Sequence, residues 1–430
     1  MSTFSGYDIF TGGKMKAAIL AIGTELLMGQ TVNTNASYLS RALSELGIGV
    51  YYHNTVGDNP KRIKESLNLL MESCDLIVTT GGLGPTLDDI TKEVIAETLG
   101  LQMILDQRSL DLIQERFRLF SRSMPESNIR QAYFPEGAII LDNSQGTAPA
   151  CILEVKGTDK VIVVLPGPPR EMKHIYHTYI ESYLKSRSQI KMHSKYLSVY
   201  DLGESALEEQ LIDLIVNQTN PTLATYAGDG KVLLRITSSG GDTIDHEKMV
   251  DDMVETVKSR VGTYIVSESG EEIDRVILNR LIANNLKIAF AESCTGGKLA
   301  SAFIQHPGAS DVVDAGFVTY SNKAKIRDLG VDKQTLVNYG AVSHQTCAEM
   351  VKGLIDKTGC DIGVSITGIA GPTGGTEEKP VGLVYIGIGI EKEVYTFENH
   401  FAGDRTTVQN RAVIKALKLL HDTLVTHDKV

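Results

Sequence analysis

The feature that most constrains the fold of this 430-residue chain is a recurring pattern: a short apolar run, then a glycine-rich segment, then a helical pattern. Such apolar runs occur at Lys16–Gly23, Asp75–Thr80, Val161–Leu165, Lys287–Ala291 and Ile362–Ile366. Continuous apolar runs of this length are typical of parallel strands that are buried on both faces. The pattern predicts open α/β sheets, in which ligands bind where the glycine-rich segments follow the strands.

The order of the expected elements divides the chain into three domains. Residues 15–187 predict a three-layer α/β domain with a mainly parallel sheet, and residues 269–430 predict a second α/β domain. Between them, residues 188–268 predict a small α+β domain of the KH-like kind. This middle domain carries no cluster of polar residues that is typical of a site, so we interpret it as a structural or dimerising spacer.

Charge and composition exclude several classes of function. The formal net charge is −11 and the chain has no basic cluster, so we expect no nucleic-acid partner. No apolar run reaches the roughly 18 residues of a membrane span, and residues 1–14 lack the regions of a signal peptide. We expect these residues to be a disordered leader or the result of an upstream start. The five cysteines are scattered, without CxxC or CxxH spacing, which favours a protein of the reducing cytoplasm.

Ser293 lies in the segment AESCTGG, between an expected strand and an expected helix. A residue at such a turn projects its side chain beside the free N–H groups of the helix start, which suit an oxyanion or a phosphate. Ser293 is therefore a candidate nucleophile. The alternative is that Ser293 or Thr295 is only the N-cap of the helix, because serine and threonine are common caps.

A nucleophilic serine needs a base, and no Ser-His-Asp trio is evident in the third domain. Lys325 lies one helical turn beyond the expected strand Phe317–Tyr320, so its side chain can fold back over the ligand crevice. A lysine can be the base where burial or a neighbouring cation lowers its pKa. The alternative is an ordinary surface charge.

Two more segments place polar chemistry near the same expected crevice. ITGIAGPTGG supplies Thr367 and several glycines, which let backbone amides approach a ligand closely. The alternative is a flexible loop. GDR places Arg405 at the start of the last helix, where its guanidinium can bind a phosphate or pair with Asp404.

The segments AESCTGG, GFVTYSNKAK, YGAVS, SITGIAGPTGG, EEKPVGLVY and GDR together resemble the C-terminal domain of the CinA family. The resemblance implies a nicotinamide mononucleotide deamidase, which is an amidohydrolase that needs no cofactor and releases nicotinic acid mononucleotide and ammonia. It implies that Ser293 is the nucleophile, Lys325 its base and Tyr320 a residue that orients the pair. Thr367 would contact the carboxamide or its oxyanion, and Arg405 would contact the phosphate.

The other substrate-binding residues that this resemblance implies are Cys294, Thr295, Gly296, Gly297, Gly368, Ile369, Ala370 and Gly371. Cys294 is the rival nucleophile. We rank it below Ser293 because no histidine is evidently paired with it.

The segments GTELLMGQTVNTN, TTGGLGPTLDD, DNSQGTAPA and LPGPPREM resemble the N-terminal domain of the same family, which is similar to the molybdopterin-binding fold. The resemblance implies an ADP-ribose pyrophosphatase that uses a divalent metal and, as a further ion, potassium. Pterin binding is the alternative, by fold analogy. The expected ligand-binding residues are Gly23, Thr24, Glu25, Asn33, Thr80, Gly81, Gly82, Gly84, Asp88, Gly146, Thr147, Pro166 and Gly167.

Asp88 and Asp89 are the expected metal ligands, with Glu25 as another, and Gly81, Gly82 and Gly84 are expected to expose N–H groups to phosphate. The alternative for the two aspartates is capping of the next helix. One departure from the family pattern is Ala150, which stands where the family usually has glycine.

The leading hypothesis is a bifunctional enzyme of pyridine nucleotide salvage, expected as a homodimer. One alternative is a monofunctional deamidase whose N-terminal domain only binds a nucleotide. Another is a competence-related protein that binds a pterin or nucleotide without catalysis.

Overall fold

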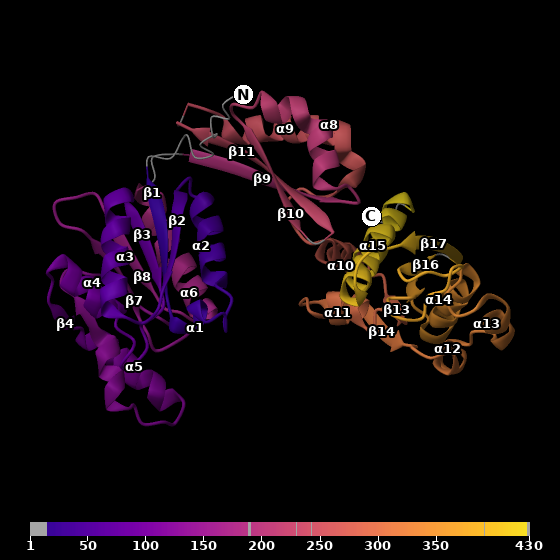
Figure 1. The fold of residues 1–430 in the computed structure, drawn as a ribbon, viewed down its shortest axis with the longest axis horizontal. Helices are drawn as coiled ribbons and strands as arrows, with labels where there is room; N and C mark the ends of the chain where they lie inside the picture. Colours follow the sequence, from indigo (N-terminus) through magenta and orange to yellow (C-terminus); the bar gives the residue numbers. More distant parts are fainter. Residues whose placement is uncertain (1–14, 188–190, 229, 242, 391, 428–430) are drawn as a thin grey trace. The chain divides into compact units, whose positions relative to one another are not determined.

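The computed structural model describes residues 15–187, 191–228, 230–241, 243–390 and 392–427. They form two compact units, which are described separately below (Figure 1). The first contains the described residues up to His193 together with Ser238–Lys248, and the second contains Ser194–Thr237 and the residues from Met249 onward. The interpretation of residues 1–14 as a leader lies outside the described residues.

A six-stranded sheet forms the centre of the first unit, with the strand order β2-β1-β3-β8-β7-β6. Its strands are β1 (Lys16–Ile22), β2 (Gly49–Val56), β3 (Leu76–Thr80), β6 (Ile139–Leu141), β7 (Ala150–Glu154) and β8 (Val161–Leu165). The first four strands in this order are parallel to one another, and β7 is antiparallel to both of its neighbours, β8 and β6. The predicted mainly parallel sheet is therefore confirmed, and β1, β3 and β8 end side by side.

Helices cover both faces of this sheet, because side chains of successive strand residues point to opposite faces. Ile19 belongs to the core under α2 and α6, whereas Leu20 belongs to the core under α3 and α4 (Figure 1). The predicted three-layer architecture is confirmed. The helices are α1 (Thr24–Leu27), α2 (Thr34–Ser44), α3 (Pro60–Ser73), α4 (Thr91–Leu99), α6 (Pro169–Ile175), the π-helical η2 (Tyr176–Ile180) and α7 (Glu181–Arg187).

The sequence pattern predicted no element between residues 101 and 135. The structure has four there: β4 (Met103–Leu105), α5 (Gln107–Leu119), η1 (Glu126–Ala132) and β5 (Tyr133–Pro135). They form a small separate core around Leu110, Ile113 and Ala132. Leu110, Ile113 and Phe117 of α5 have the spacing of one helix face, so the helical pattern was present in the sequence and the prediction missed it.

The middle segment forms a four-stranded sheet with the order β10-β11-β9-β12. Its elements are β9 (Lys191–Tyr200), α8 (Glu204–Val216), β10 (Thr222–Gly228), β11 (Lys231–Gly240), α9 (His246–Val261), η3 (Gly262–Tyr264) and β12 (Ile265–Ser267). β10 and β11 form an antiparallel hairpin. The predicted α+β character of this segment is confirmed.

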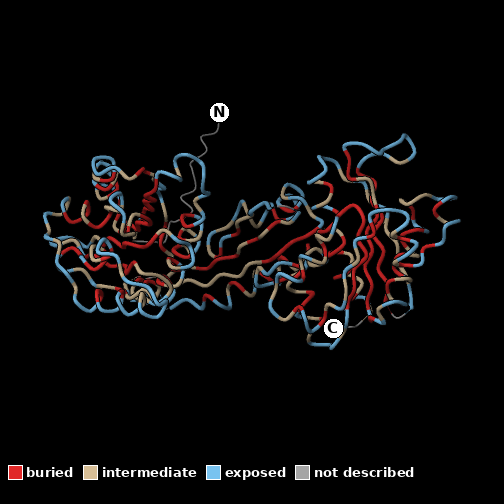
Figure 2. Tube along the Cα trace, turned by 90° about the horizontal axis from the view of Figure 1, so that it is seen from below, coloured by how far each residue is buried: buried red, intermediate tan, exposed pale blue. Residues whose placement is uncertain are grey.

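The last segment contains a five-stranded sheet with the order β14-β13-β15-β16-β17. The strands are β13 (Ile288–Glu292), β14 (Val313–Val318), β15 (Ile362–Gly368), β16 (Leu383–Ile390) and β17 (Glu393–His400). β13 is parallel to β14 and β15, and β16 and β17 form an antiparallel pair. β13, β15 and β16 are buried, as expected for strands with helices on both faces, whereas β14 and β17 at the sheet edges are partly exposed. Figure 2 marks the buried, intermediate and exposed residues along the backbone.

One face of this sheet packs on α10, α11 and α15, and the other on α12, α13 and α14. The helical elements are α10 (Ile273–Ala283), α11 (Lys298–Ile304), η4 (Ala309–Asp311), α12 (Asn322–Leu329), α13 (Lys333–Tyr339), α14 (His344–Thr358) and α15 (Arg405–Thr426). None of the helices in the described ranges combines the length and apolar content that a membrane crossing needs.

The expected strand Phe317–Tyr320 is shifted in the structure. β14 runs from Val313 to Val318, where its pairing with β13 ends at Glu292. Tyr320 therefore follows the strand and is 65% exposed. β14 lies at the edge of the sheet, and its residues alternate between partly buried and exposed. The strand therefore has no continuous apolar run that would fix its bounds in the sequence.

Within the second unit, the long helix α15 also contacts the middle segment. The Lys415 ammonium lies 2.7 Å from the Asp201 carboxylate. Gly230 approaches Ile414 so closely that a Cβ at this glycine would overlap the isoleucine side chain. α15 thus packs on the five-stranded sheet and also contacts turns of the middle segment.

α14 packs closely against the end of α12 at Gly353, where an added Cβ would overlap the backbone carbonyl of Leu329. Gly353→Ala must push the two helices apart, so we expect it to lower the free energy of unfolding by about 1–3 kcal/mol in urea denaturation. Gly203→Ala is the matched control, since its Cβ would meet no atom within 4 Å. Equal losses in both variants would contradict this packing.

Candidate functional sites

Ser293 and Lys325 meet where β13 ends. Ser293 follows β13 directly, and Lys325 lies in the first turn of α12. The Lys325 Nζ atom is 2.8 Å from Ser293 Oγ, and it donates a second hydrogen bond to the Thr319 carbonyl at 2.7 Å. The structure therefore brings the predicted serine and lysine together.

Burial sets the chemistry of Lys325. Its side chain is 1% exposed, and burial lowers its pKa from 10.5 to about 8, while the neighbouring Cys294 thiol opposes the shift. An ammonium group carries three N–H donors, and two acceptors are in place. Because its pKa is about 8, part of Lys325 is in the neutral form near neutral pH, and the nitrogen lone pair of this form can accept the proton of the Ser293 hydroxyl. The alternative of a solvated surface charge is wrong.

The turn that carries Ser293 is not a helix cap. α11 begins at Lys298, and its N-cap is Gly297 in the left-handed region, with φ 99°. The Ser293 amide donates to the Ile366 carbonyl at 2.9 Å, and the Gly296 amide donates to the Ser293 carbonyl at 3.2 Å. The alternative that Ser293 or Thr295 caps the helix is therefore wrong.

The expected free N–H groups at the start of α11 need a correction. The Glu292 carboxylate accepts hydrogen bonds from the Gly297, Leu299 and Ala300 amides at 3.0, 3.1 and 2.9 Å. The sequence interpretation missed Glu292, although acidic residues favour helix N-termini. The Cys294 and Thr295 amides, which follow Ser293 in the sequence, have no partner on another residue in the described part of the chain.

Cys294 is a poor rival for the nucleophile. It is 5% exposed, and burial raises the pKa of its thiol to about 11. The thiolate is the reactive form of cysteine, so little of it exists near neutral pH. The Cys294 carbonyl accepts a hydrogen bond from Gln409 Nε2 at 2.7 Å. Gln409 of α15 thus supports the turn, and no sequence motif had indicated it.

Arg405 joins three of the predicted segments. Its guanidinium donates to the Gly371 carbonyl at 2.8 Å and to the Tyr320 hydroxyl at 3.3 Å. Asp404 instead caps α15 by accepting from the Thr407 amide at 2.8 Å. The alternative of an Arg405–Asp404 pair is therefore wrong, and the exposed guanidinium stands beside Tyr320.

The segment after β15 is more tightly bonded than expected. Thr367 is 1% exposed and its hydroxyl donates to the Ala341 carbonyl at 2.7 Å. The Ile369 amide donates to the Leu383 carbonyl at 2.9 Å, and Gly368 packs against Val384. Thr367 and Ile369 therefore offer no free donor here; these contacts hold the loop against β16. Ala370 is also buried.

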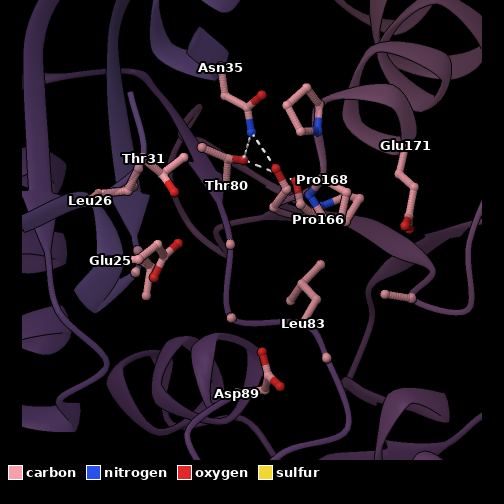
Figure 3. Close-up of a pocket in the computed structure, with 18 of the residues that line it drawn as sticks. Glu25, Leu26, Thr31, Asn35, Thr80, Leu83, Asp89, Pro166, Pro168 and Glu171 are labelled. Carbon is pink, nitrogen blue, oxygen red and sulfur yellow. Dashed lines mark hydrogen bonds between the residues drawn. The ribbon is translucent and has the colours of Figure 1, made fainter. Parts of the chain in front are cut away.

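A second candidate site is a cavity of about 600 Å³ where β1, β3 and β8 end (Figure 3). This volume is in the usual range for small-molecule sites. Twelve of the fourteen residues predicted for this site line it: Gly23, Glu25, Asn33, Thr80, Gly81, Gly82, Gly84, Asp88, Asp89, Thr147, Pro166 and Gly167.

Thr24 and Gly146 do not line this cavity. The Thr24 amide and hydroxyl both donate to the Asp58 carboxylate at 2.8 Å. Gly146 lies against Glu171, whose carboxylate an added Cβ would overlap. Glu171 lines the cavity, although the sequence pattern did not predict it. Asn143 Nδ2 donates a hydrogen bond to its carboxylate at 2.6 Å.

The three glycines after β3 differ in their backbone contacts. The Gly81 amide donates to the Leu165 carbonyl at 3.0 Å and is not exposed to a ligand, which corrects the prediction. Gly81 has φ 106°, and a Cβ there would overlap the Ile22 carbonyl. In the described part of the chain, the Gly82 and Gly84 amides have no partner, so they remain available to an anion.

Asn35 lies close to the start of α2 but does not cap it. The N-cap of α2 is Asn33, whose side chain accepts from the Ala36 amide at 3.1 Å. Asn35 Nδ2 instead donates to Thr80 Oγ1 at 2.9 Å and to the Gly167 carbonyl at 2.7 Å (Figure 3). Its buried Oδ1 atom has no hydrogen-bond partner among the described residues. Asn35 thus ties two cavity loops together and keeps one acceptor free.

The predicted metal ligands do not form a complete site by themselves. Asp89 accepts hydrogen bonds from the Thr86 amide and hydroxyl, while the N-cap of α4 is Ile90, so neither aspartate caps that helix. Within the ranges that the structure describes, no three His, Cys, Asp or Glu side chains are grouped to hold a metal ion. A divalent ion here would therefore need phosphate oxygens as additional ligands.

Ala150 departs from the family pattern inside the sheet. It is fully buried as the first residue of β7 and pairs with Leu141. Its methyl group is accommodated there, away from the residues that line the cavity.

These folds and sites define a multidomain α/β protein with a buried serine–lysine pair and a separate nucleotide-sized cavity. Residues 270–424 match the CinA C-terminal domain, residues 18–186 the probable molybdopterin binding domain, and residues 194–267 the damage-inducible protein CinA KH domain. The putative competence-damage inducible protein of Clostridium novyi is 48% identical over 411 residues, which cover 96% of this chain and 99% of the relative. The CinA-like protein of Dictyoglomus thermophilum is 45% identical over 96% of this chain and all of its own. The chain belongs to the CinA family.

Solved structures with similarity cover one part of the chain. A competence-damaged protein (CinA) superfamily protein from Escherichia coli is 43% identical over 35% of this chain and 87% of its own, with a TM-score of 0.34. The protein CinA with unknown function from Thermoplasma acidophilum is 31% identical over 40% of this chain and 98% of its own, with a TM-score of 0.37.

The state of Lys325 can be measured directly. In protein with ¹³C-labelled lysine, we expect its side chain to titrate near pH 8, because burial lowers its pKa to about 8. Lys92, whose pKa burial also lowers to about 8, must be distinguished by the missing signal in Lys325→Arg. A Lys325 midpoint above about pH 10, the value of a free lysine, would contradict the buried neutral amine.

Proposed function

We propose that the C-terminal domain hydrolyses the carboxamide of nicotinamide mononucleotide to nicotinic acid mononucleotide and ammonia, without a cofactor. The observation that carries this proposal is the 2.8 Å contact between Ser293 Oγ and the buried amine of Lys325. A serine becomes nucleophilic when a neighbouring base takes its proton. Membership of the CinA family supports the substrate, through the resemblance of the quoted motifs.

In the proposed reaction, Ser293 Oγ attacks the carboxamide carbon while Lys325 accepts the hydroxyl proton. The tetrahedral intermediate collapses when Lys325 returns this proton to the leaving nitrogen, which departs as ammonia. Water then attacks the acyl-enzyme with Lys325 again as base, and Ser293 is released. The unpaired Cys294 and Thr295 amides are the candidate donors to the oxyanion.

Arg405 supports a substrate with a phosphate. Its exposed guanidinium is bound to only a carbonyl and a phenol, both neutral groups, so its charge is not neutralised by these contacts. A phosphate placed there would receive charge-assisted hydrogen bonds. Tyr320 would then reach the substrate through its contact with Arg405.

We also propose that the N-terminal cavity hydrolyses the pyrophosphate of ADP-ribose. The cavity of about 600 Å³, its unpaired Gly82 and Gly84 amides and its carboxylates support a phosphate-rich ligand. Asp88 and Asp89 would hold a divalent cation together with phosphate oxygens, and the cation would neutralise charge on those oxygens. The alternatives are a cavity that only binds a nucleotide or a pterin.

The deamidase is tested by the release of ammonia from nicotinamide mononucleotide. We expect Ser293→Ala to reduce kcat by about a thousandfold or more, and Lys325→Met to have a similar effect, because the two act as one unit. Wild-type kcat/KM should rise with pH to a plateau, with a midpoint near 8, since the base must be neutral and the pKa of Lys325 is about 8. Cys294→Ala is the matched control and should retain activity. Loss in Cys294→Ala with retention in Ser293→Ala would transfer the nucleophile to the cysteine.

The N-terminal activity is tested by AMP release from ADP-ribose with Mg²⁺ and with EDTA. We expect turnover only with the metal, and loss of turnover in Asp88→Asn/Asp89→Asn with the deamidase unchanged, because the two sites lie in separate units. Binding of ADP-ribose without turnover would favour the monofunctional alternative. No turnover of either substrate by folded protein would favour a non-catalytic role.

A further inference from the structure

Glu292 is a buried carboxylate beside the proposed nucleophile. It is the last residue of β13, is 1% exposed and immediately precedes Ser293. In the described part of the chain it forms no ion pair; its oxygens accept hydrogen bonds from the Gly297, Leu299 and Ala300 amides. A buried carboxylate needs several good partners, and here all of them are backbone donors from the start of α11.

These hydrogen bonds close the turn that carries Ser293. The turn starts at Glu292 and ends at Gly297, and the Glu292 side chain joins both ends. Inside it, the Gly296 amide donates to the Ser293 carbonyl, and the Ser293 amide is fixed on Ile366. The direction of the Ser293 hydroxyl toward Lys325 therefore depends on where Glu292 holds the helix start.

The same carboxylate fills the position at which an anion would otherwise bind. A helix N-terminus attracts negative charge because its first amides are unpaired, but here three of these amides already have a partner within the chain. These three amides are therefore not available to an anionic group of the substrate, whereas the guanidinium of Arg405 is exposed and can bind one.

We propose that Glu292 is a positioning residue, which fixes the Ser293 turn against Lys325 by occupying the start of α11 and leaves the substrate phosphate to Arg405. The inference rests on the proposed serine–lysine hydrolysis. Glu292 contacts neither the substrate nor the reacting atoms.

The test is Glu292→Gln. A glutamine side chain has one acceptor oxygen and a donor NH₂ group, so at least one of the three amides would face another donor. We expect kcat for nicotinamide mononucleotide to fall about tenfold to a hundredfold, since small displacements of a nucleophile have such effects. KM should change little, because the phosphate contact is elsewhere. The midpoint of the pH profile should stay near 8, because the base is still Lys325.

The matched control is Asp332→Ala, which removes the cap of α13, a hydrogen bond from the Gln334 amide at 2.9 Å. It should lower the melting temperature but leave kcat unchanged. If Glu292→Gln keeps full kcat, or raises KM with kcat unchanged, the positioning role is overturned. If Asp332→Ala loses as much kcat, general destabilisation explains the effect and the proposal is equally overturned.

A second readout separates this proposal from the proposed function. Wild type and Glu292→Gln are treated with a small fluorophosphonate, and labelling of Ser293 is followed by mass spectrometry. We expect slower labelling in the variant by about tenfold or more. If wild type labels at Ser293 but does not release ammonia, the substrate is wrong and positioning can still be judged from the labelling rates. Equal labelling rates in both proteins would overturn the role of Glu292.

Discussion

The chemistry of the site in the third domain depends on the burial of the Lys325 amine, which has no acidic side chain among its described hydrogen-bond partners. Charged groups are costly to bury, and among the residues that the structure describes the hydrogen-bond partners of Lys325 are a hydroxyl and a carbonyl. Burial therefore disfavours the ammonium form of Lys325 and lowers its pKa. A carboxylate turned toward this amine would reverse the effect, and Glu292, which precedes Ser293 in the sequence, is turned toward the helix amides.

The sequence predicted the reactive pair better than its surroundings. Ser293 and Lys325 each follow a predicted strand, and parallel strands end at one edge of a sheet, so local pattern was enough. Glu292 and Gln409 were missed because their roles depend on amides and carbonyls that only the folded backbone presents. Similarly, either asparagine of the Asn33–Asn35 segment can cap a helix; the contact with Thr80 decides between them, and it comes from another strand.

The glycine-rich segments do follow the strands as predicted, but the sequence does not distinguish glycines with free amides from those that allow close packing. Gly81 and Gly368 are packed against backbone, and Gly146 against a carboxylate. Gly296 has open space around it. The distinction depends on which chain segment lies behind each glycine, and this information is tertiary. Residues 101–135 were missed for a different reason: Leu110, Ile113 and Phe117 do recur at helical spacing, and this local pattern was overlooked.

The helix α15 has one more consequence. Gln409 supports the nucleophile turn, and Lys415, roughly 9 Å further along the helix axis, is bound to Asp201 of the middle segment. Residues 194–267 contain twelve acidic and six basic residues, a balance that opposes binding to a nucleic-acid backbone. Because α15 contacts both the middle segment and the turn that carries Ser293, a change in the middle segment that displaces this helix would also displace that turn.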